Sequence, residues 1–362
     1  MLTGPALRNA TAAIVATCRA GLDLDAFRTA VLPRLRRIVP VDALWWAATD
    51  PVTLLFTRAQ REGLPADSGP YFVEDEFVRD DVNKWTELAR SRGGVNTLMR
   101  ATEGHPDRSD RYRDVFAPMG LQDELRAVLR VRGVSWGYLC LHREGADAHF
   151  SDAEVRFVRS LAPHLADGLR MGLVRTAAEH EPVALRGARG PGLVLIHADG
   201  SIGGLNQAAG PWLEDLGGQP DGVDLPVEIR ALATGISHRD AALQLLPRLR
   251  VRTRSGRWAA LHASWMTSDR DGAVAVIIED AAPADVAPVL MAAYGLTARE
   301  QEVAAFVCRG LSTREITARL HVTVDTVQDH LKSVYDRTGV HSRGELVALI
   351  YRHDYLPRIA TG

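Results

Sequence analysis

The sequence has little cysteine and no long hydrophobic run. Its three cysteines, Cys18, Cys140 and Cys308, are odd in number and far apart, which excludes a disulfide framework and fits a reducing compartment. No apolar stretch approaches the ~20 residues that span a bilayer, and the N-terminus lacks the apolar region of a signal peptide. We therefore expect a cytoplasmic protein with no membrane partner.

An excess of charge of one sign is also missing. Lysine and arginine together number 43, against 45 aspartates and glutamates, and only Lys84 and Lys332 are lysines. The resulting net charge of −2 excludes a polybasic coat for nucleic acid, so any contact with DNA has to be local.

What is present is an ordinary globular composition. Hydrophobic residues make up 46% and charged residues 24% of the 362 residues, which is typical of two or three soluble domains. Two stretches predict linkers: 175–192 mixes charge, Pro and Gly without apolar periodicity, and 281–288 is rich in Pro and Ala. They divide the chain into three expected domains, 1–176, 190–283 and 290–362.

The first two expected domains mix helices and strands. In the first, the spacing of apolar residues predicts a helix over 25–38. The other elements predicted there are strands 41–48 and 52–57, a polar helix-rich stretch 75–119, a hairpin of 125–131 and 134–142, and a long helix from Ser151 to about Arg175. In the second domain the predicted order is two strands, helices and three strands. Its predicted elements are strands 192–197 and 202–205, helices 207–216 and 227–235, a hairpin of 249–253 and 258–266, and a strand 272–279.

The C-terminal segment has the strongest local signals. Three capping boxes begin helices, each a hydroxyl followed three residues later by a glutamate: Thr297 with Glu300, Ser312 with Glu315, and Ser342 with Glu345. Gly310 supplies the end of the first of these helices.

A helix that begins near Val324 follows the turn His321-Val322-Thr323. It directs Val327, Leu331 and Val334 inward and leaves one polar stripe outward. That stripe consists of Asp325, Gln328, Asp329, Lys332 and Asp336. A short helix, a tight turn and a longer helix of this kind predict a helix-turn-helix, whose second helix fits the DNA major groove.

The run LTAREQEV…RGLSTREI…TV..H…TGV.SR.EL resembles the LuxR-type DNA-binding domain. The resemblance implies a four-helix domain that binds double-stranded promoter DNA as a homodimer. On the matching positions it implies base contacts by Gln328, Asp329 and Lys332, and phosphate contacts by Thr323, Thr326, Arg314, Arg337 and Arg343. Two aspartates, Asp325 and Asp329, place negative charge on the stripe that would face the DNA. Residues 290–362 contain nine basic and eight acidic residues, so the net charge of this segment is low for a DNA-binding domain.

The middle domain resembles a PAS domain, on its strand order, the Asp199-Gly200 turn and Asn206 after the second strand. No cysteine there could react with a flavin. His197, His238 and His262 are possible haem ligands but are more simply surface or core residues, so no cofactor is expected.

The first domain resembles a GAF domain, on the stretch DRSDRYRDVFAPMGLQDELRAVLRVRGVSWGYLCLHR. The resemblance implies a pocket in a concave sheet. The aromatic candidates for its lining are Trp45 or Trp46, Phe72, Trp85, Tyr112, Trp136 and Tyr138, and the alternative is that they are plain core.

Two further features of the first domain have structural interpretations. Strand alternation places Cys140 on one face with Trp136 and Tyr138, where it is expected to be a small buried hydrophobe. The acidic residues 74–76 with 80 and 81 are expected to be solvated loop charges rather than a metal site, because no histidine lies among them.

The fold class expected is therefore a multidomain α+β chain: a GAF-like α/β domain, a PAS-like α/β domain and an all-α four-helix DNA-binding domain with a helix-turn-helix. The function expected is a one-component transcriptional regulator and not an enzyme, with a small-molecule or protein signal and a possible contact with RNA polymerase. The long helix from Ser151 is the expected dimer element.

Three alternatives differ from that interpretation. A phosphorylated response regulator needs a lysine on a later strand, and Lys84 is in a helical stretch. A methionine-sulfoxide-reducing GAF enzyme needs several cysteines close together. The last alternative is a ligand-independent DNA-binding or protein-interaction regulator with degenerate sensor domains.

Overall fold

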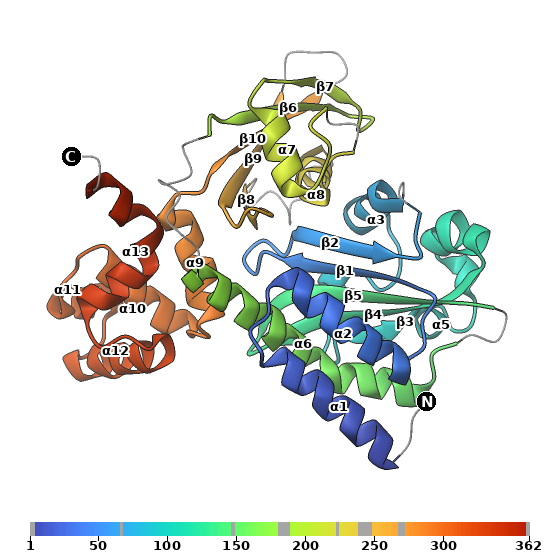
Figure 1. Cartoon of the computed structure of the whole chain (residues 1–362), viewed down its shortest axis with the longest axis horizontal. Helices are drawn as coiled ribbons and strands as arrows, with labels where there is room; N and C mark the ends of the chain where they lie inside the picture. Colours follow the sequence, from blue (N-terminus) through green and yellow to red (C-terminus); the bar gives the residue numbers. More distant parts are fainter. Residues whose placement is uncertain are drawn as a thin grey trace.

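Two antiparallel sheets and a helical C-terminal head make up the chain in the computed structural model (Figure 1). The structure describes residues 4–65, 68–145, 149–179, 189–221, 224–237, 248–266 and 272–359. This arrangement confirms the multidomain α+β class expected from the sequence. Among the described residues, no helix is both long and apolar enough to span a bilayer.

The first sheet has the strand order β2-β1-β5-β4-β3. Its strands are β1 (Ala43–Thr49), β2 (Phe56–Glu62), β3 (Val95–Thr97), β4 (Leu121–Val131) and β5 (Val134–Glu144). The strand predicted over 52–57 begins later, at Phe56. The chain turns before it, where the Asp50 carboxylate accepts the N–H of Val52. The predicted hairpin of β4 and β5 is present, and Arg132 and Gly133 both have positive φ, as a two-residue hairpin turn requires.

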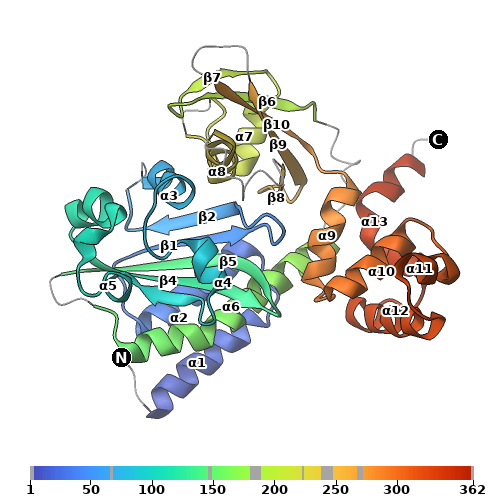
Figure 2. The same ribbon diagram turned by 180° about the vertical axis from the view of Figure 1, so that it is seen from behind.

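Helices cover both faces of this sheet (Figures 1 and 2). On one face lie α1 (Gly4–Cys18), α2 (Leu24–Ile38) and α6 (Asp152–Glu179). On the other lie α3 (Ser68–Phe77) and α4 (Trp85–Arg90), with the short α5 (Leu98–Ala101) beside β3. Three short turns of 3-10 or π type, 106–108, 112–116 and 117–119, lead into β4.

The second sheet repeats the same order as β7-β6-β10-β9-β8. Its strands are β6 (Gly192–His197), β7 (Ile202–Leu205), β8 (Arg248–Arg252), β9 (Trp258–Met266) and β10 (Ala273–Asp280). Two helices, α7 (Ala209–Leu216) and α8 (Val227–Ser237), pack on one face and close an apolar core around Trp212. The predicted order of strands and helices in this domain is therefore present.

The helix α9 (Pro283–Ala293) occupies most of the predicted linker over 281–288. Pro283 stands in its first turn, where a missing N–H costs nothing. Its side chains enter three separate cores: Ala293 contacts the first domain, Val289 contacts Trp258 of the second, and Met291 contacts the C-terminal helices. The linker interpretation is wrong because Pro and Ala, which also suit an irregular tether, here form a buried connecting helix. The other predicted linker lies largely outside the described residues.

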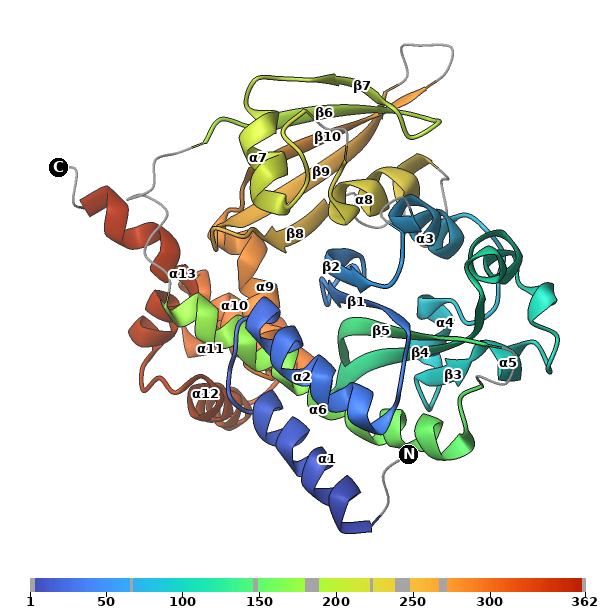
Figure 3. The ribbon, with the colours of Figure 1, turned by 45° about the vertical axis from the view of Figure 1, so that its right-hand side comes forward.

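The C-terminal head contains four helices (Figure 3). They are α10 (Ala298–Cys308), α11 (Thr313–Leu320), α12 (Val324–Thr338) and α13 (Arg343–Ile359). The capping boxes at Thr297 and Ser312 are complete, with each glutamate returning to the backbone of its hydroxyl residue. At α13 the Glu345 carboxylate instead accepts the N–H of His341, while the Ser342 hydroxyl accepts the N–H of Glu345.

Candidate nucleic-acid interface and sensor sites

The predicted recognition helix α12 has one buried and one exposed face. Val327, Leu331 and Val334 are buried in the core of the head. The stripe Asp325, Gln328, Asp329, Lys332 and Asp336 is exposed along the helix. Three predicted base-contact residues therefore share one accessible surface of a helix, and a major groove admits an α-helix.

The N-terminus of α12 is built by two threonines. The Thr323 hydroxyl accepts the N–H of Thr326 at 3.2 Å and lies 2.8 Å from the Thr326 hydroxyl. His321, at a φ of 53°, makes the left-handed residue that ends α11 and turns the chain. A helix start of this kind favours a phosphate through its free N–H groups and the helix dipole.

The predicted phosphate-binding arginines differ in their surroundings. Arg314 is exposed on α11. Arg337 donates to the Gly295 carbonyl at 2.8 Å and lies 3.5 Å from the Glu300 carboxylate. Arg343 donates to the Leu311 carbonyl at 2.6 Å and to the Thr313 hydroxyl at 2.8 Å. The last two side chains thus also brace helices within the head, which the sequence did not indicate.

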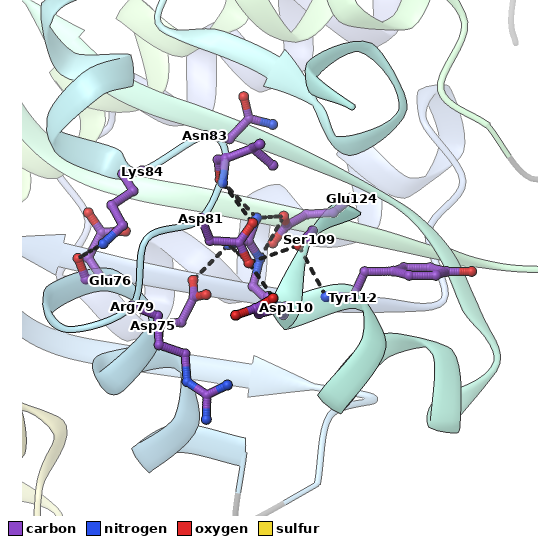
Figure 4. Close-up of polar contacts among 12 residues, drawn as sticks. Asp75, Glu76, Arg79, Asp81, Asn83, Lys84, Ser109, Asp110, Tyr112 and Glu124 are labelled. Atoms are coloured by element: carbon purple, nitrogen blue, oxygen red, sulfur yellow. Dashed lines mark hydrogen bonds and ion pairs between the residues drawn. The ribbon is translucent and has the colours of Figure 1, made fainter. Parts of the chain in front are cut away.

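A buried polar network lies on the α3 side of the first sheet (Figure 4). The Arg111 guanidinium pairs with Asp75 and with Glu124, each at 2.7 Å. Arg126 pairs with the other oxygen of Glu124 at 3.0 Å and with Glu76 at 3.4 Å. All five side chains are almost fully buried.

This network corrects the expectation of solvated loop charges for Asp75, Glu76 and Asp81, whereas Glu74 and Asp80 are exposed. Asp75 and Glu76 lie in α3 and point to the sheet, where two arginines of later segments neutralise them. Asp81 belongs to the same cluster, because it accepts the backbone N–H of Arg111 and the Ser109 hydroxyl, each at 2.9 Å. The sequence did not reveal the partners, since they are remote along the chain.

Burial and charge set the protonation of this network in opposite directions. Burial alone would raise the pKa of Glu124, but the charges of Arg111 and Arg126 outweigh it and lower that pKa. Burial, together with the charge of Asp75, raises the pKa of Glu76 to about 7 against the opposing charge of Arg126. The network therefore holds both a strongly ionised carboxylate and one that is only partly ionised near neutral pH.

Cys140 and His142 of β5 border the same network. The Cys140 thiol lies 2.8 Å from Glu124 and 3.3 Å from the Nε2 atom of His142. Burial raises the pKa of the thiol, and burial lowers the pKa of His142 to about 4. Glu124, Cys140 and His142 could geometrically hold a metal ion, but Arg111 and Arg126 already neutralise the carboxylate, so we assign no metal there.

The six aromatic candidates for a pocket do not share one site. Phe72, Trp85 and Tyr138 gather on the network side of the sheet around Trp45. Tyr112 borders the same side near Phe72. Trp46 and Trp136 instead enter the core beneath α2 and α6.

The predicted shared face of Trp136, Tyr138 and Cys140 is wrong because β5 has a bulge. Leu129 pairs with Gly137 and Arg130 with Ser135, so Trp136 is an extra residue in its strand and turns to the opposite face.

The histidines of the middle domain do not form a haem site among the described residues. His197 is exposed at the end of β6, and His262 of β9 lies 3.2 Å from Glu279. His238 lies outside the described residues.

The fold and the exposed α12 define a class of multidomain regulators in which α/β domains are joined to a helix-turn-helix head. Comparisons with known proteins agree with that class. Residues 295–350 match the luxR family of bacterial regulatory proteins, and residues 23–169 match the GAF domain. The chain therefore carries a LuxR-type DNA-binding domain at its C-terminal end and a GAF domain at its N-terminal end. Together with the regulator relatives, the two matches indicate a transcription regulator and not an enzyme, as the sequence predicts.

Individual relatives match mainly through the head. The chain is 44% identical over 54 residues to the probable transcriptional regulatory protein SgaR of Hyphomicrobium methylovorum, covering 15% of this chain and 26% of SgaR. It is 30% identical over 61 residues to the response regulator VraR of Staphylococcus aureus, covering 17% and 29%. The chain thus spans between a quarter and a third of the length of these relatives. The SdiA structure from Escherichia coli aligns over 96% of this chain and 99% of SdiA, at 10% identity and a TM-score of 0.35.

Proposed function

We propose that the chain is a one-component transcriptional regulator, which binds promoter DNA as a homodimer through α12. The domain boundaries proposed are 1–176, 190–283 and 290–362, and the proposed location is the cytoplasm. The observation that carries the proposal is the exposed stripe of Gln328, Asp329 and Lys332 on a head that matches the luxR family. A signal received by the first two domains changes the population of arrangements in which two heads match the half-site spacing.

In the DNA complex, α12 enters the major groove and Lys332 contacts base edges. The Asp329 carboxylate accepts a hydrogen bond from cytosine N4, which makes its negative charge a source of selectivity. Arg314, Thr323 and Thr326 position the head on the backbone. Arg337 and Arg343 contribute by fixing the helices as well as by their charge.

The helix α6 is the expected dimer element, and over 152–175, where its side chains are described, most of its fully exposed residues are polar. Most of this helix packs into the first domain, with Val155, Leu161 and Leu165 fully buried. Its exposed stripe is polar and includes Arg156, Arg159 and His164. Deleting the helix would therefore remove part of the core of the first domain rather than test association alone.

The test is fluorescence anisotropy with the chain's own upstream DNA and a scrambled control, over a series of salt concentrations. Specific binding should exceed non-specific binding by about 10³ or more. Lys332→Ala should weaken specific binding by about 1–3 kcal/mol, since it removes a groove contact. The control is Arg309→Ala, which removes an exposed basic residue of the same head outside the stripe.

Equal weakening by both substitutions would contradict groove contact by Lys332. Equal affinity for both DNAs, with a steep salt dependence only, would contradict the regulator.

A further inference from the structure

A cavity of about 850 Å³ lies between the first and second domains. Its walls come from the start of α2, the ends of β1 and β2, the later part of α6, and β8 with its following turn. Figure 3 shows β2 and β8 as the neighbouring strands of the two sheets. The volume is in the range of sites that bind small molecules, and such sites are often found at domain interfaces.

The lining of this cavity has an excess of positive charge. Five arginines and three aspartates line it. The arginines are Arg28, Arg58, Arg250, Arg252 and Arg254.

Each of the three carboxylates already has a partner. Asp23 accepts two N–H groups at the start of α2. Asp25 pairs with Arg58 at 2.5 Å, and Asp50 pairs with Arg250 at 3.2 Å. Buried Glu228, nearby on α8, adds little negative charge at pH 7, because burial raises its pKa to about 8.

Arg28 is the residue that most needs a counter-charge. Its side chain is only 1% exposed and donates to the Arg58 carbonyl at 3.0 Å. Among the described residues, no carboxylate lies within ion-pair distance of it. Burial lowers its pKa to about 9, which leaves it charged at neutral pH. A buried cation without an anion is costly, so the site is poised to gain from one.

The cavity side chains also carry more hydrogen-bond donors than acceptors. Within the described part of the chain, the buried N–H groups of lining residues that have no acceptor include Arg28 Nε, Arg250 Nε, Trp136 Nε1 and Trp258 Nε1. Two aromatic rings and the aliphatic side chains of Leu169, Leu173 and Val289 supply an apolar wall beside them. This combination fits a ligand with a planar apolar body and an acidic group.

We propose that the interdomain cavity is an effector site for an aromatic organic anion, whose carboxylate or phosphate is held by Arg28 and Arg250. The ring system packs against Trp136 and Trp258. Arginine suits this role, because its planar fork matches the oxygens of either acidic group.

The same cavity reaches the helix that leads to the DNA-binding head. Val289 belongs to α9, and Met291 of the same helix is buried in the core of the head. A ligand that changes the packing of Val289 therefore changes the position of α9. This regulatory part of the inference rests on the proposed function, whereas the binding part does not.

The experiment is isothermal titration calorimetry of the full chain with 1-naphthyl phosphate, 1-naphthoate and neutral 1-naphthol. At least one of the two anions should bind, and the anion with the higher affinity should bind at least tenfold more tightly than 1-naphthol. Which anion has the higher affinity shows whether the site prefers a phosphate or a carboxylate. Arg28→Gln should weaken anion binding by about tenfold, equivalent to about 1.4 kcal/mol. Arg37→Gln, an exposed arginine on the same helix, should leave binding unchanged.

A second variant guards against misfolding of Arg28→Gln. Thr57→Trp fills the cavity from the strand β2 and should abolish binding while the circular dichroism and thermal melting stay close to wild type. No binding of either anion to the wild-type chain, or binding unaffected by Thr57→Trp, would overturn the site.

DNA binding in the presence of the tighter anion separates the two proposals. A changed affinity for the upstream DNA supports an effector site, and the DNA should change anion affinity by the same factor. Anion binding without sequence-specific DNA binding would leave the cavity site standing and overturn the regulator. Specific DNA binding with unaltered affinity in the anion would overturn the effector role alone.

Discussion

The two sheets have the same strand order and all their neighbours are antiparallel, yet they are stabilised in different ways. The first is covered on both faces and buries Arg111, Arg126 and Glu124 on one of them. Among the described residues, helices cover only one face of the second, and Ile277 on its other face is 42% exposed. Strand order therefore does not determine whether a sheet face becomes an apolar core, an ionic layer or an open surface.

The largest effect should come from breaking the ionic layer. Arg111→Met removes the guanidinium between Asp75 and Glu124 and leaves both carboxylates buried. We expect a loss of about 3–5 kcal/mol in the free energy of unfolding, measured by chemical denaturation. Arg113→Met is the control, because Arg113 is exposed and should cost less than about 1 kcal/mol. A small effect of Arg111→Met would show that the layer is not needed for stability.

A substitution in the apolar core of the second sheet should lower the free energy of unfolding by less than Arg111→Met does, and by the same amount at each pH. Leu261→Ala leaves a cavity beneath α8 and should cost about 3 kcal/mol at any pH between 5 and 8. The same change at Leu195, half-buried on the uncovered face, should cost clearly less. If the two substitutions lower the free energy of unfolding equally, the face of the sheet that carries Leu195 is covered in solution, although it is uncovered in the single chain.

The smallest effect should be a dependence on pH that belongs to the first sheet. The folded pKa of Glu76 is raised from 4.5 to about 7, so the folded chain binds this proton more tightly than the unfolded chain. The contribution of Glu76 to stability is therefore complete at low pH and is lost as the pH rises from about 4.5 to about 7.

Comparison with Glu76→Gln isolates this contribution. The free energy of unfolding of the wild type, relative to the variant, should fall as the pH rises across that interval. His142 acts in the opposite sense, since its lowered pKa removes stability as the pH falls toward 4, and it is present in both proteins. Glu87→Gln, at an exposed position, is the control. A difference that stays flat with pH would mean that Glu76 is ionised in the folded state.

The sequence predicted the local elements better than the long-range partners. Capping boxes and the hairpin turn at Arg132-Gly133 depend on neighbouring residues, so they could be read directly. The strand β4 alternates charged residues such as Glu124 and Arg126 with apolar ones, which is the pattern of a half-exposed strand. The pattern cannot distinguish water from a buried ionic layer, because the partner Asp75 comes from a remote helix.

The candidate sites divide in the same way. The exposed stripe of α12 follows from helical spacing, and Gln328 and Lys332 lie where that spacing predicts. Trp136 does not lie where strand alternation predicts, because a single bulge in β5 turns its side chain to the opposite face of the first sheet. The interdomain cavity could not be predicted, since Arg28 and Arg250 come from different domains and no local pattern connects them.

The buried helix α9 has a consequence for how the chain melts. Its eleven residues contribute side chains to the cores of all three domains, so loss of any one core uncovers apolar surface shared with the others. Domains joined by an extended tether would melt independently, whereas these three are thermodynamically coupled. Calorimetry should therefore record one cooperative heat-absorption peak for the chain, and a signal that loosened α9 would divide that peak before it lowered the melting temperature.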